Sequence, residues 1–342
     1  MSLSIYGKLP TGERLKRIKA SPNYKAGSFQ NLSKTNAMAE DASFFKTIRD
    51  FMHKPKSVTP DKVLPFVKTD LKSLSKEKTQ LVWFGHSSYL IFTAGKTILV
   101  DPVFSGHAAP FSFMIKAFKG SNEYGVQHLP KIDVLLLTHD HYDHLDHKTM
   151  LKLTGKVGKV VCSLGVGSHL EHWGMDKKLI HELDWWENYS DASLSFTAAP
   201  GRHFSGRGLK RGQSLWSSFI LKTKDANLFL GGDSGYDSHF KDIGKKFGPF
   251  DLAILEAGQY NRSWPHIHMM PEETVQASLD LNAKQLLPVH WGKFSLAMHP
   301  WNESIQRVQK KAKELQVVLR TPLMGEAFMI GEPAQHHHWW EI

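Results

Sequence analysis

The sequence predicts an α/β protein in which two β-sheets pack face to face and helices cover the outside. Short apolar runs typical of β-strands form two groups, one within residues 81–137 and the other within residues 194–289. Helical patterns fall between and after these runs, most clearly at 271–281 and 303–315. Because a sheet or an amphipathic helix must bury one face against another layer, this arrangement favours a sandwich.

The individual strands are predicted where β-branched and aromatic residues cluster between turn residues. In the first group the runs occupy residues 81–84, 88–92, 97–100 and 132–137. In the second group they occupy residues 194–197, 216–221, 227–230, 251–255 and 285–289. The helix predicted at 271–281 begins with Pro271, a favourable first-turn residue, and Glu272 and Glu273 lie near the positive end of its dipole.

Length and composition indicate how the chain is organised. With 342 residues, of which 41% are hydrophobic, the chain is long enough for one large α/β domain or two small ones. Residues 1–78 are polar and show little periodicity, apart from one short predicted helix at 42–51. We therefore predict an N-terminal extension over residues 1–78 that packs on a main domain formed by residues 79–342.

Cysteine content and charge narrow the class of protein. The chain has one cysteine, Cys162, so a disulfide framework and a cysteine-based zinc site are excluded. Because Cys162 lies in an apolar run, we expect it in the core. The formal net charge is +10, with basic clusters at 14–19 and 307–313, which fits either an anionic partner or a solvated surface. No run reaches the ~18 apolar residues of a membrane span, and the N-terminus lacks a signal-peptide core. A cytoplasmic location is therefore expected.

The segment 138–146 carries the strongest functional signal in the chain. It places His139, His141 and His144, together with three aspartates, directly after the apolar run 132–137. A buried strand that ends in imidazoles and carboxylates predicts a metal site at the edge of a sheet. This set of ligands suits zinc, iron or manganese better than calcium or magnesium.

Further residues of ligand type follow other predicted strands. His203, Asp233 and His290 each come at or just beyond the end of a strand in the second group. Since strand ends of one sheet lie side by side, we expect these residues to converge with the cluster at 138–146. Glu256 also follows a strand, but a surface position or a place behind the ligands fits the sequence equally well.

The chain resembles the metallo-β-lactamase superfamily in its metal-binding pattern, which here consists of His139, His141, Asp143, His144, His203, Asp233 and His290. That resemblance implies an αββα four-layer sandwich with two divalent metal ions, expected to be Zn²⁺, at one edge of the sheets. It also implies how the ligands divide. One ion would be held by His139, His141 and His203, and the other by Asp143, His144 and His290. Asp233 would bridge the two ions.

Within this superfamily the chain is similar to the N-acyl-phosphatidylethanolamine-hydrolysing phospholipase D family. The motifs that carry the likeness lie at residues 7–10, 21–24, 83–88, 98–105, 138–146, 268–273 and 289–294. The likeness departs at 106–128, where Phe111, Phe113 and Phe118 belong to an apolar patch. It implies a zinc phosphodiesterase that cleaves N-acyl phosphatidylethanolamine or a related phosphodiester, with His268 as the proton donor to the leaving group.

Such a site would act through a hydroxide that bridges the two metals and attacks phosphorus in line. Asp143 is assigned to the catalytic residues as well as to the ligands. Asp101 or Asp146 is expected to orient the imidazoles that bind metal. The apolar patch is expected to pack in the core, to form a lid, or to contact lipid with Lys116 and Lys119 near the head groups.

Two other functions remain open from the sequence. One is hydrolysis of a sugar lactone or of a nucleic-acid phosphodiester in the same fold. A nuclease would be expected to carry an added domain for its substrate, and the chain has no room for one, so no nucleic-acid partner is expected. The other is a non-catalytic metal-binding interaction protein, which seven ligands argue against because structural zinc sites rarely need two metals. The expected partners are a phospholipid or other phosphodiester and, peripherally, a membrane surface.

Overall fold

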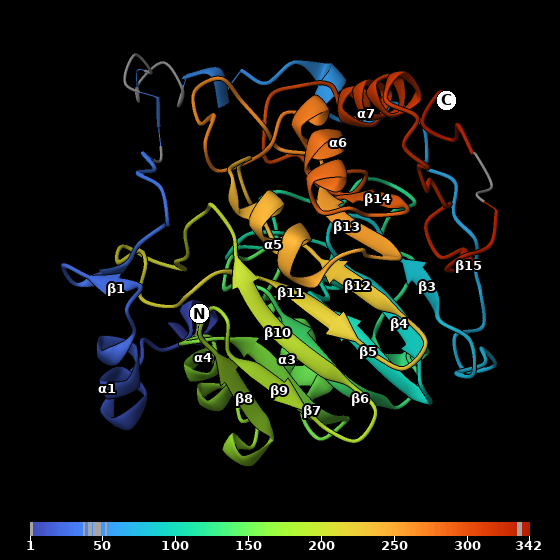
Figure 1. Ribbon diagram of the computed structural model, residues 1–342. Coiled ribbons are helices and arrows are strands. Elements are labelled where there is room, and N and C mark those ends of the chain that lie inside the picture. The colour runs from blue at the N-terminus through green and yellow to red at the C-terminus, as the bar shows by residue number, and fades with distance from the viewer. Residues whose placement is uncertain (1–2, 37, 40–42, 44–48, 52, 334–336) are drawn as a thin grey trace.

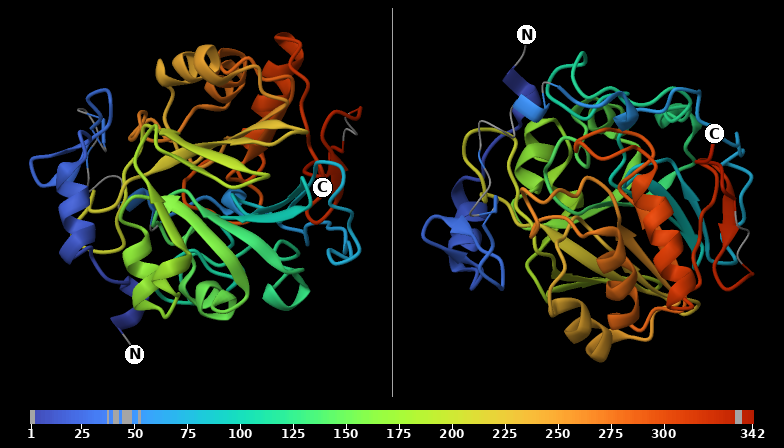
Figure 2. Two further views of the ribbon diagram at one scale, coloured as in Figure 1. Left: turned by 60° about the horizontal axis from the view of Figure 1, so that its bottom comes forward. Right: turned by 90° about the horizontal axis from the view of Figure 1, so that it is seen from above.

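Two mixed β-sheets form the centre of the molecule, and helices cover the outer face of each sheet (Figures 1 and 2). This computed structural model describes residues 3–36, 38–39, 43, 49–51, 53–333 and 337–342. The left view of Figure 2 shows the four layers edge-on, with α5, α6 and α7 above the sheets and α3 and α4 below them. The predicted αββα sandwich is confirmed. The helix predicted at 42–51 lies largely outside the described residues.

The larger sheet has seven strands in the order β15-β3-β4-β5-β6-β7-β8. Its strands are β3 (Gln80–Trp83), β4 (Tyr89–Thr93), β5 (Lys96–Val100), β6 (Ile132–Leu137), β7 (Val157–Ser163), β8 (Ile180–Leu183) and β15 (Ala327–Met329). Strands β5 to β8 pair in parallel, whereas the other pairs are antiparallel. Its outer face is covered by α3 (His147–Leu153) and α4 (Gly167–His172). The short helices η3 (Val126–His128) and η4 (Lys177–Leu179) lie in its connections.

The smaller sheet has six strands in the order β14-β13-β12-β11-β10-β9. Its strands are β9 (Asn188–Ser190), β10 (Ser195–Pro200), β11 (Ser217–Lys222), β12 (Asn227–Leu230), β13 (Leu252–Glu256) and β14 (Leu286–Val289). Strands β12 to β14 are parallel and the others antiparallel. The helices α5 (His239–Phe247), α6 (Pro271–Asp280) and α7 (Glu303–Glu314) cover its outer face.

The core follows from the alternation of side chains along each strand. In β4, Tyr89 and Ile91 point into the core between the two sheets, where residues of both sheets meet. Leu90 and Phe92 point the other way, into the layer beneath α3 and α4. Both faces of this strand are therefore buried, which explains why such strands read as continuous apolar runs rather than as alternating patterns.

The nine predicted strands correspond to β3–β6 and β10–β14, and the first residue of each lies within one position of its prediction. The strands β7, β8 and β9 and the helices α3, α4 and α5 were not predicted. The edge strands β8 and β9 are partly exposed and carry polar residues, so that they lack an apolar run. In β7, Gly158 and Lys159 interrupt the apolar pattern.

The first part of the N-terminal segment, residues 3–31, lies along one edge of the sandwich, beside α4, whereas its later part lies near α7 (Figure 1), where the backbone N of Trp301 donates to the carbonyl oxygen of Ser57 at 2.9 Å. The elements of the whole segment are η1 (Leu3–Tyr6), α1 (Gly12–Ala20), β1 (Tyr24–Lys25), β2 (Ser28–Phe29) and η2 (Lys56–Val58). Arg14, from the first basic cluster, forms ion pairs with Glu182 at 2.7 Å and Glu171 at 3.0 Å. Part of this cluster therefore docks the segment on the sandwich. The boundary between residues 78 and 79 stays a prediction. No helix in the described part of the chain is long and apolar enough to cross a membrane.

Candidate metal centre

The loop 138–146 leaves β6 at its buried end and is held at both of its own ends. At the start, Thr138 donates from its backbone N and its Oγ1 to the carboxylate of Asp101, at 2.9 and 2.5 Å. At the end, Asp146 caps α3 by accepting a hydrogen bond from the backbone of Lys148 at 3.2 Å. The three histidines between these points are thus carried by a rigid loop.

The first cluster contains His139, His141, His203 and Asp233, which offer ligand atoms within 4.8 Å of one another. Nδ1 of His141 lies 3.0 Å from Nε2 of His139 and 3.2 Å from Nε2 of His203. Oδ2 of Asp233 lies 3.9 Å from the first of these Nε2 atoms and 3.7 Å from the second. Three imidazoles and one carboxylate therefore face a common point.

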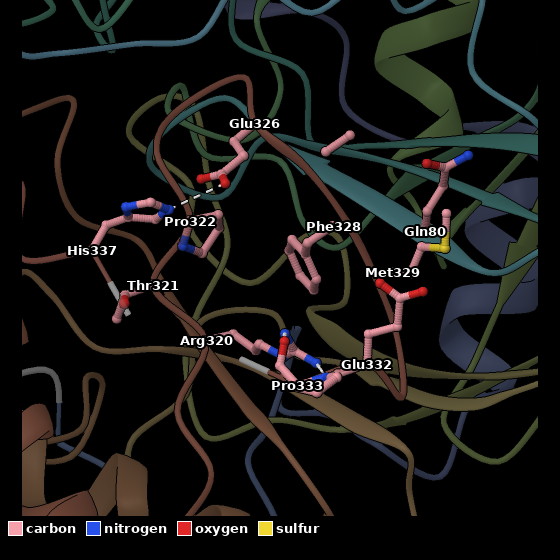
Figure 3. A pocket seen from close by; sticks show the side chains of 11 residues that line it. Gln80, Arg320, Thr321, Pro322, Glu326, Phe328, Met329, Glu332, Pro333 and His337 are labelled. Carbon is pink, nitrogen blue, oxygen red and sulfur yellow. Dashed lines mark hydrogen bonds and ion pairs between the residues drawn. The ribbon is translucent and has the colours of Figure 1, made fainter. Parts of the chain in front are cut away.

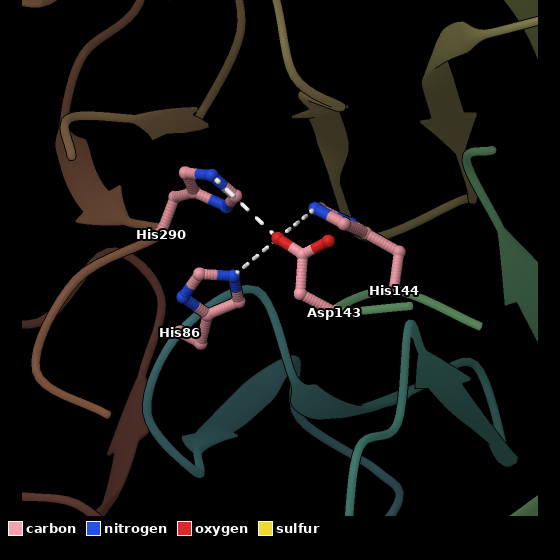
Figure 4. A group of neighbouring side chains, drawn as sticks. All are labelled: His86, Asp143, His144 and His290. Atoms are coloured by element: carbon pink, nitrogen blue, oxygen red, sulfur yellow. Dashed lines mark hydrogen bonds and ion pairs between the residues drawn. The ribbon is translucent and has the colours of Figure 1, made fainter. Parts of the chain in front are cut away.

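The second cluster contains His86, Asp143, His144 and His290, also with ligand atoms within 4.8 Å of one another. Figure 4 shows the three imidazoles arranged around the carboxylate of Asp143. Oδ2 of this carboxylate lies 2.8 Å from Nε2 of His86, 3.5 Å from Nε2 of His144 and 3.9 Å from Nε2 of His290.

Asp233 links the two clusters. Its Oδ2 faces the first cluster, while its Oδ1 lies 3.2 Å from both Nε2 of His144 and Nδ1 of His290. Two glycines before Asp233 let the chain pass close to neighbouring strands. A Cβ at Gly231 would lie 2.6 Å from the carbonyl oxygen of Ile254, and a Cβ at Gly232 would lie 2.6 Å from that of Ser217, so that no larger residue fits at either position. The structure thus brings all seven predicted ligands together around one carboxylate.

His268 lies beside both clusters. Its ring centroid is 5.0 Å from that of His203 and 5.2 Å from that of His290. Its Nδ1 lies 3.3 Å from both carboxylate oxygens of Glu256, which also accepts a hydrogen bond from the backbone N of Met269 at 2.9 Å. Glu256 is buried. The sequence left open whether Glu256 lies at the surface or behind the ligands, and the structure places it behind them.

In this centre three imidazoles are held neutral and the carboxylate of Asp233 is held charged, which favours a bound cation. Burial holds the pKa of His139, His203 and His290 well below the ordinary value, which keeps their nitrogens free to bind a cation. Burial also opposes the charged form of Asp233, but His144 and His290 keep the pKa of this carboxyl well below its usual range. For His144 burial is likewise outweighed, because Asp233 and Asp143 raise its pKa well above the ordinary value.

The ligand atoms themselves fit a metal. Among the described residues, Nε2 of His144, Nε2 of His290 and Oδ1 of Asp233 are buried without a hydrogen-bond partner. Buried polar atoms without a partner are costly, and in native proteins such a group calls for an explanation, such as a bound ion. Imidazoles and carboxylates at these separations are the ligands that a divalent transition metal prefers.

A family model described as the β-lactamase superfamily domain matches residues 96–291, a span that includes all seven predicted ligands. The protein belongs to the metallo-β-lactamase superfamily. The superfamily resemblance inferred from the motifs is confirmed, and the protein is a metal-dependent hydrolase of this superfamily with a candidate metal site.

Individual relatives extend this finding. A protein of Mycobacterium tuberculosis is 36% identical over 327 residues, which cover 94% of this chain and 88% of the relative. The N-acyl-phosphatidylethanolamine-hydrolyzing phospholipase D 1 of Caenorhabditis elegans is 28% identical over 251 residues, which cover 68% of each chain. Among solved structures, Igni18, a metallo hydrolase of the archaeon Ignicoccus hospitalis, aligns with a TM-score of 0.57 at 18% identity, over 74% of this chain and 98% of that chain. The resemblance to the phospholipase D family named above is thus also supported.

Hydrogen bonds behind the superfamily ligands orient several of them. Asp101 accepts from Nδ1 of His144 at 2.8 Å, as expected from the sequence, and Ser87 Oγ lies 2.9 Å from Nδ1 of His290. The expectation that Asp146 orients an imidazole is wrong. Its carboxylate accepts hydrogen bonds from the backbone N of Ser105 and from Oγ1 of Thr149, in addition to the capping bond at the start of α3.

His86 was not singled out from the sequence. It is fully buried, and its Nε2 contacts Asp143 in the second cluster. The signal was present, because His86 follows the strand predicted at 81–84 just as the other site residues follow theirs.

Two hollows in the described part of the chain differ in their relation to the clusters. One opens at His203 between residues 28–36 and the loop at 204–212, and its lining is polar, with Lys34 and Arg211 among its residues. The other is lined by β15 and the chain on either side of it, together with Gln80 and His337 (Figure 3), and its lining contains none of the predicted ligands. There Arg320 donates to Gln285 Oε1 at 3.0 Å, and Glu326 pairs with His337 at 3.2 Å. Both Arg320 and Glu326 of this second hollow thus already have partners within the chain.

Proposed function

We propose that the protein is a binuclear zinc phosphodiesterase that cleaves N-acyl phosphatidylethanolamine or a related phosphodiester. The observation that carries the proposal is the position of Asp233, whose two carboxylate oxygens face an imidazole cluster on either side. One carboxylate between two sets of imidazoles suits two cations close enough to act on one phosphate. The phosphodiester substrate is inferred from the relative named as a phospholipase D.

Each cluster would hold one ion. His139, His141 and His203 would bind the first, and Asp143, His144 and His290 would bind the second, with Asp233 shared between them. When bound, two divalent cations lower the pKa of a water molecule and neutralise charge on phosphoryl oxygens. His86 would orient the carboxylate of Asp143 through the contact at 2.8 Å.

His268 would supply the proton that the leaving alkoxide needs. Burial opposes a charge on its imidazole, but the charge and hydrogen bond of Glu256 raise the pKa of His268 above the ordinary value. A protonated imidazole beside the ligand rings is a suitable general acid. Burial raises the pKa of Glu256 as well. His268 and Glu256 therefore titrate as a coupled pair that can share one proton.

The loop around Phe113 would contact the lipid. Phe113 is 72% exposed, and its ring stacks on that of Phe111 at 5.7 Å between centroids. Phe118, in contrast, is buried, so only the first half of the sequence patch faces solvent. Ile115 packs with Phe294, whose ring lies 5.3 Å from that of His86. An aromatic pair of which Phe113 is exposed, close to the second cluster, fits peripheral contact of a cytoplasmic protein with a membrane.

A comparison of substrates tests the proposal. The zinc-loaded protein should hold two ions and should hydrolyse an N-acyl phospholipid and a bis-aryl phosphodiester, but not a sugar lactone. His139→Ala should abolish this activity, whereas His181→Ala in β8 should retain it. Turnover of the lactone alone, or fewer than two bound ions, would contradict the assignment.

A further inference from the structure

The backbone at His203 needs hydrogen-bond partners that its own sheet does not provide. The ladder between β10 and β11 ends at the pair Pro200 and Ser217, so His203 lies beyond the last paired residue of its strand. The residue is nevertheless buried. An unpaired N–H or C=O in such a place is costly, and partners must therefore come from elsewhere in the chain.

Asn31, in the N-terminal segment, supplies both partners. Its Nδ2 donates to the carbonyl oxygen of His203 at 2.8 Å, and its Oδ1 accepts from the backbone N of His203 at 3.0 Å. Oδ1 also accepts from Nε1 of Trp216 at 3.0 Å, which fixes the orientation of the amide. The side chain of Asn31 thus replaces the neighbouring strand at this point.

The imidazole of His203 is fixed by a further bond. Its Nδ1 donates to the carbonyl oxygen of Ile267 at 2.8 Å, which leaves Nε2 on the side of His141 and Asp233. With the backbone held by Asn31 and the ring held by Ile267, His203 has one orientation in which to bind an ion.

A second contact reaches the loop at 138–146. Asp140, between two predicted ligands, lies 3.2 Å from Nε2 of His169. The other ring nitrogen of His169, Nδ1, accepts a hydrogen bond from the backbone N–H of Lys8 at 3.1 Å. Because Nδ1 is the acceptor there, Nε2 carries the proton and donates it to Asp140.

Gly7 makes this second contact sterically feasible. Its φ is +71°, and a Cβ at this position would lie 2.0 Å from Nδ1 of His169. A side chain would push the segment away from His169. The segment also accepts, at the carbonyl oxygen of Ile5, a hydrogen bond of 2.9 Å from Arg207, which donates to the carbonyl oxygen of Asp140 at 2.8 Å.

We infer that the N-terminal segment positions ligands of the metal centre. Asn31 and the backbone at residues 7–8 position the ligands of the first cluster. The inference rests on the proposed two-metal site and adds to it a role for residues 5–31. The second cluster is held differently, by Asp101 and Ser87 within the sandwich. Substitutions in the segment should therefore lower the affinity for the ion at the first cluster and leave the affinity for the other ion unchanged.

The test compares two Asn→Leu variants of the zinc-loaded protein. Asn31→Leu removes the two bonds to His203. Asn23→Leu removes a bond of similar length between the same segment and the sandwich, from Nδ2 of Asn23 to Oδ1 of Asp184 at 2.9 Å. Zinc affinity at both sites is measured by competition with a chelator, and the cobalt-substituted proteins are compared by visible absorption.

Asn31→Leu should bind one of the two ions about 10–100-fold more weakly, as is typical when a residue behind a ligand is lost. The cobalt spectrum should change for that ion alone. Asn23→Leu should keep both affinities, even if its melting temperature falls. Gly7→Ala should lower the affinity for the same ion as Asn31→Leu does. Where Asn31→Leu does not fold, Asn31→Asp, which keeps the Oδ1 acceptor and loses the Nδ2 donor, takes its place.

Wild-type affinity for both ions in Asn31→Leu would overturn the inference, and so would an equal loss in Asn23→Leu. A wild-type protein that holds two ions but cleaves no phosphodiester would refute only the proposed function, since the affinity comparison does not depend on turnover. A wild-type protein that binds fewer than two ions would refute both.

Discussion

The two candidate metal clusters have similar side chains but are supported from different parts of the chain. In the second cluster, His144 is held by Asp101 just beyond β5, and His290 by Ser87 in the turn between β3 and β4. In the first cluster, His203 is held by Asn31, more than a hundred residues away in the N-terminal segment. A sheet positions a ligand by itself only where other residues at the same strand ends can reach it. Where the strand pairing stops short of the ligand, a distant segment must complete the site.

The largest effect is expected from Asp233, which both clusters share. Asp233→Asn removes the charge between the two sets of imidazoles, so both ions should be lost and activity should fall by more than the ~10–100-fold typical of a residue behind the ligands. Metal content after dialysis and hydrolysis of a bis-aryl phosphodiester measure this. Asp237→Asn, near the surface beside Arg202, serves as the control. Two tightly held ions in Asp233→Asn would contradict the bridging role.

Asp101→Asn should affect the second cluster more than the first, in contrast to Asn31→Leu. Without its charge, the hydrogen bond from Nδ1 of His144 weakens, and the ion at the second cluster should bind about 10–100-fold more weakly. Asp146→Asn is the matched control, since Asp146 caps α3 and should change stability by about 1 kcal/mol or less without changing either metal affinity. Equal effects of the two variants on zinc affinity would refute the distinction.

The proton-donor role of His268 predicts a displaced pH profile. As a general acid, His268 must be protonated, so kcat/KM should fall as the pH rises through its pKa. Burial lowers this pKa, whereas Glu256 raises it. Glu256→Gln removes the strongest of the groups that oppose burial, leaving only the charges of Asp233 and Asp143, and should move the alkaline limb of the profile to lower pH, by about 1 pH unit. Glu314→Gln on the exposed side of α7 should leave the profile in place, and an unchanged limb in Glu256→Gln would argue against His268 as the acid.

The smallest effect on chemistry is expected at the lipid-facing loop. Phe113→Ser should reduce binding to phosphatidylcholine vesicles and hydrolysis of the vesicle-bound lipid, while hydrolysis of a soluble bis-aryl phosphodiester stays unchanged. Leu151→Ser in α3 removes another exposed apolar side chain and should leave vesicle binding intact. Equal loss in both variants, measured by vesicle sedimentation, would show that the loop has no special role.

Much of the fold was predictable because its strands are buried on both faces. Runs such as 132–137 are apolar enough to be recognised locally, and nine strands were found in this way. The edge strands β8 and β9 and the short helices α3 and α4 were not, since they carry mixed polar sequences whose conformation depends on what they pack against. The division of the chain at residue 78, the identity of the metal and the roles of the ligands stay predictions.

The sequence by itself determined the set of ligand-type residues, because the cluster at 138–146 is local and because His203, Asp233 and His290 follow recognisable strand ends. Only the tertiary structure decided what stands behind them. It paired His268 with Glu256, brought His86 to Asp143, and placed Asn31 on the backbone of His203. Each of these contacts consists of one or two polar interactions between individual groups that the fold brings together. Such bonds leave no periodicity or spacing in the sequence, because any polar side chain that the fold brings within about 3 Å can form them.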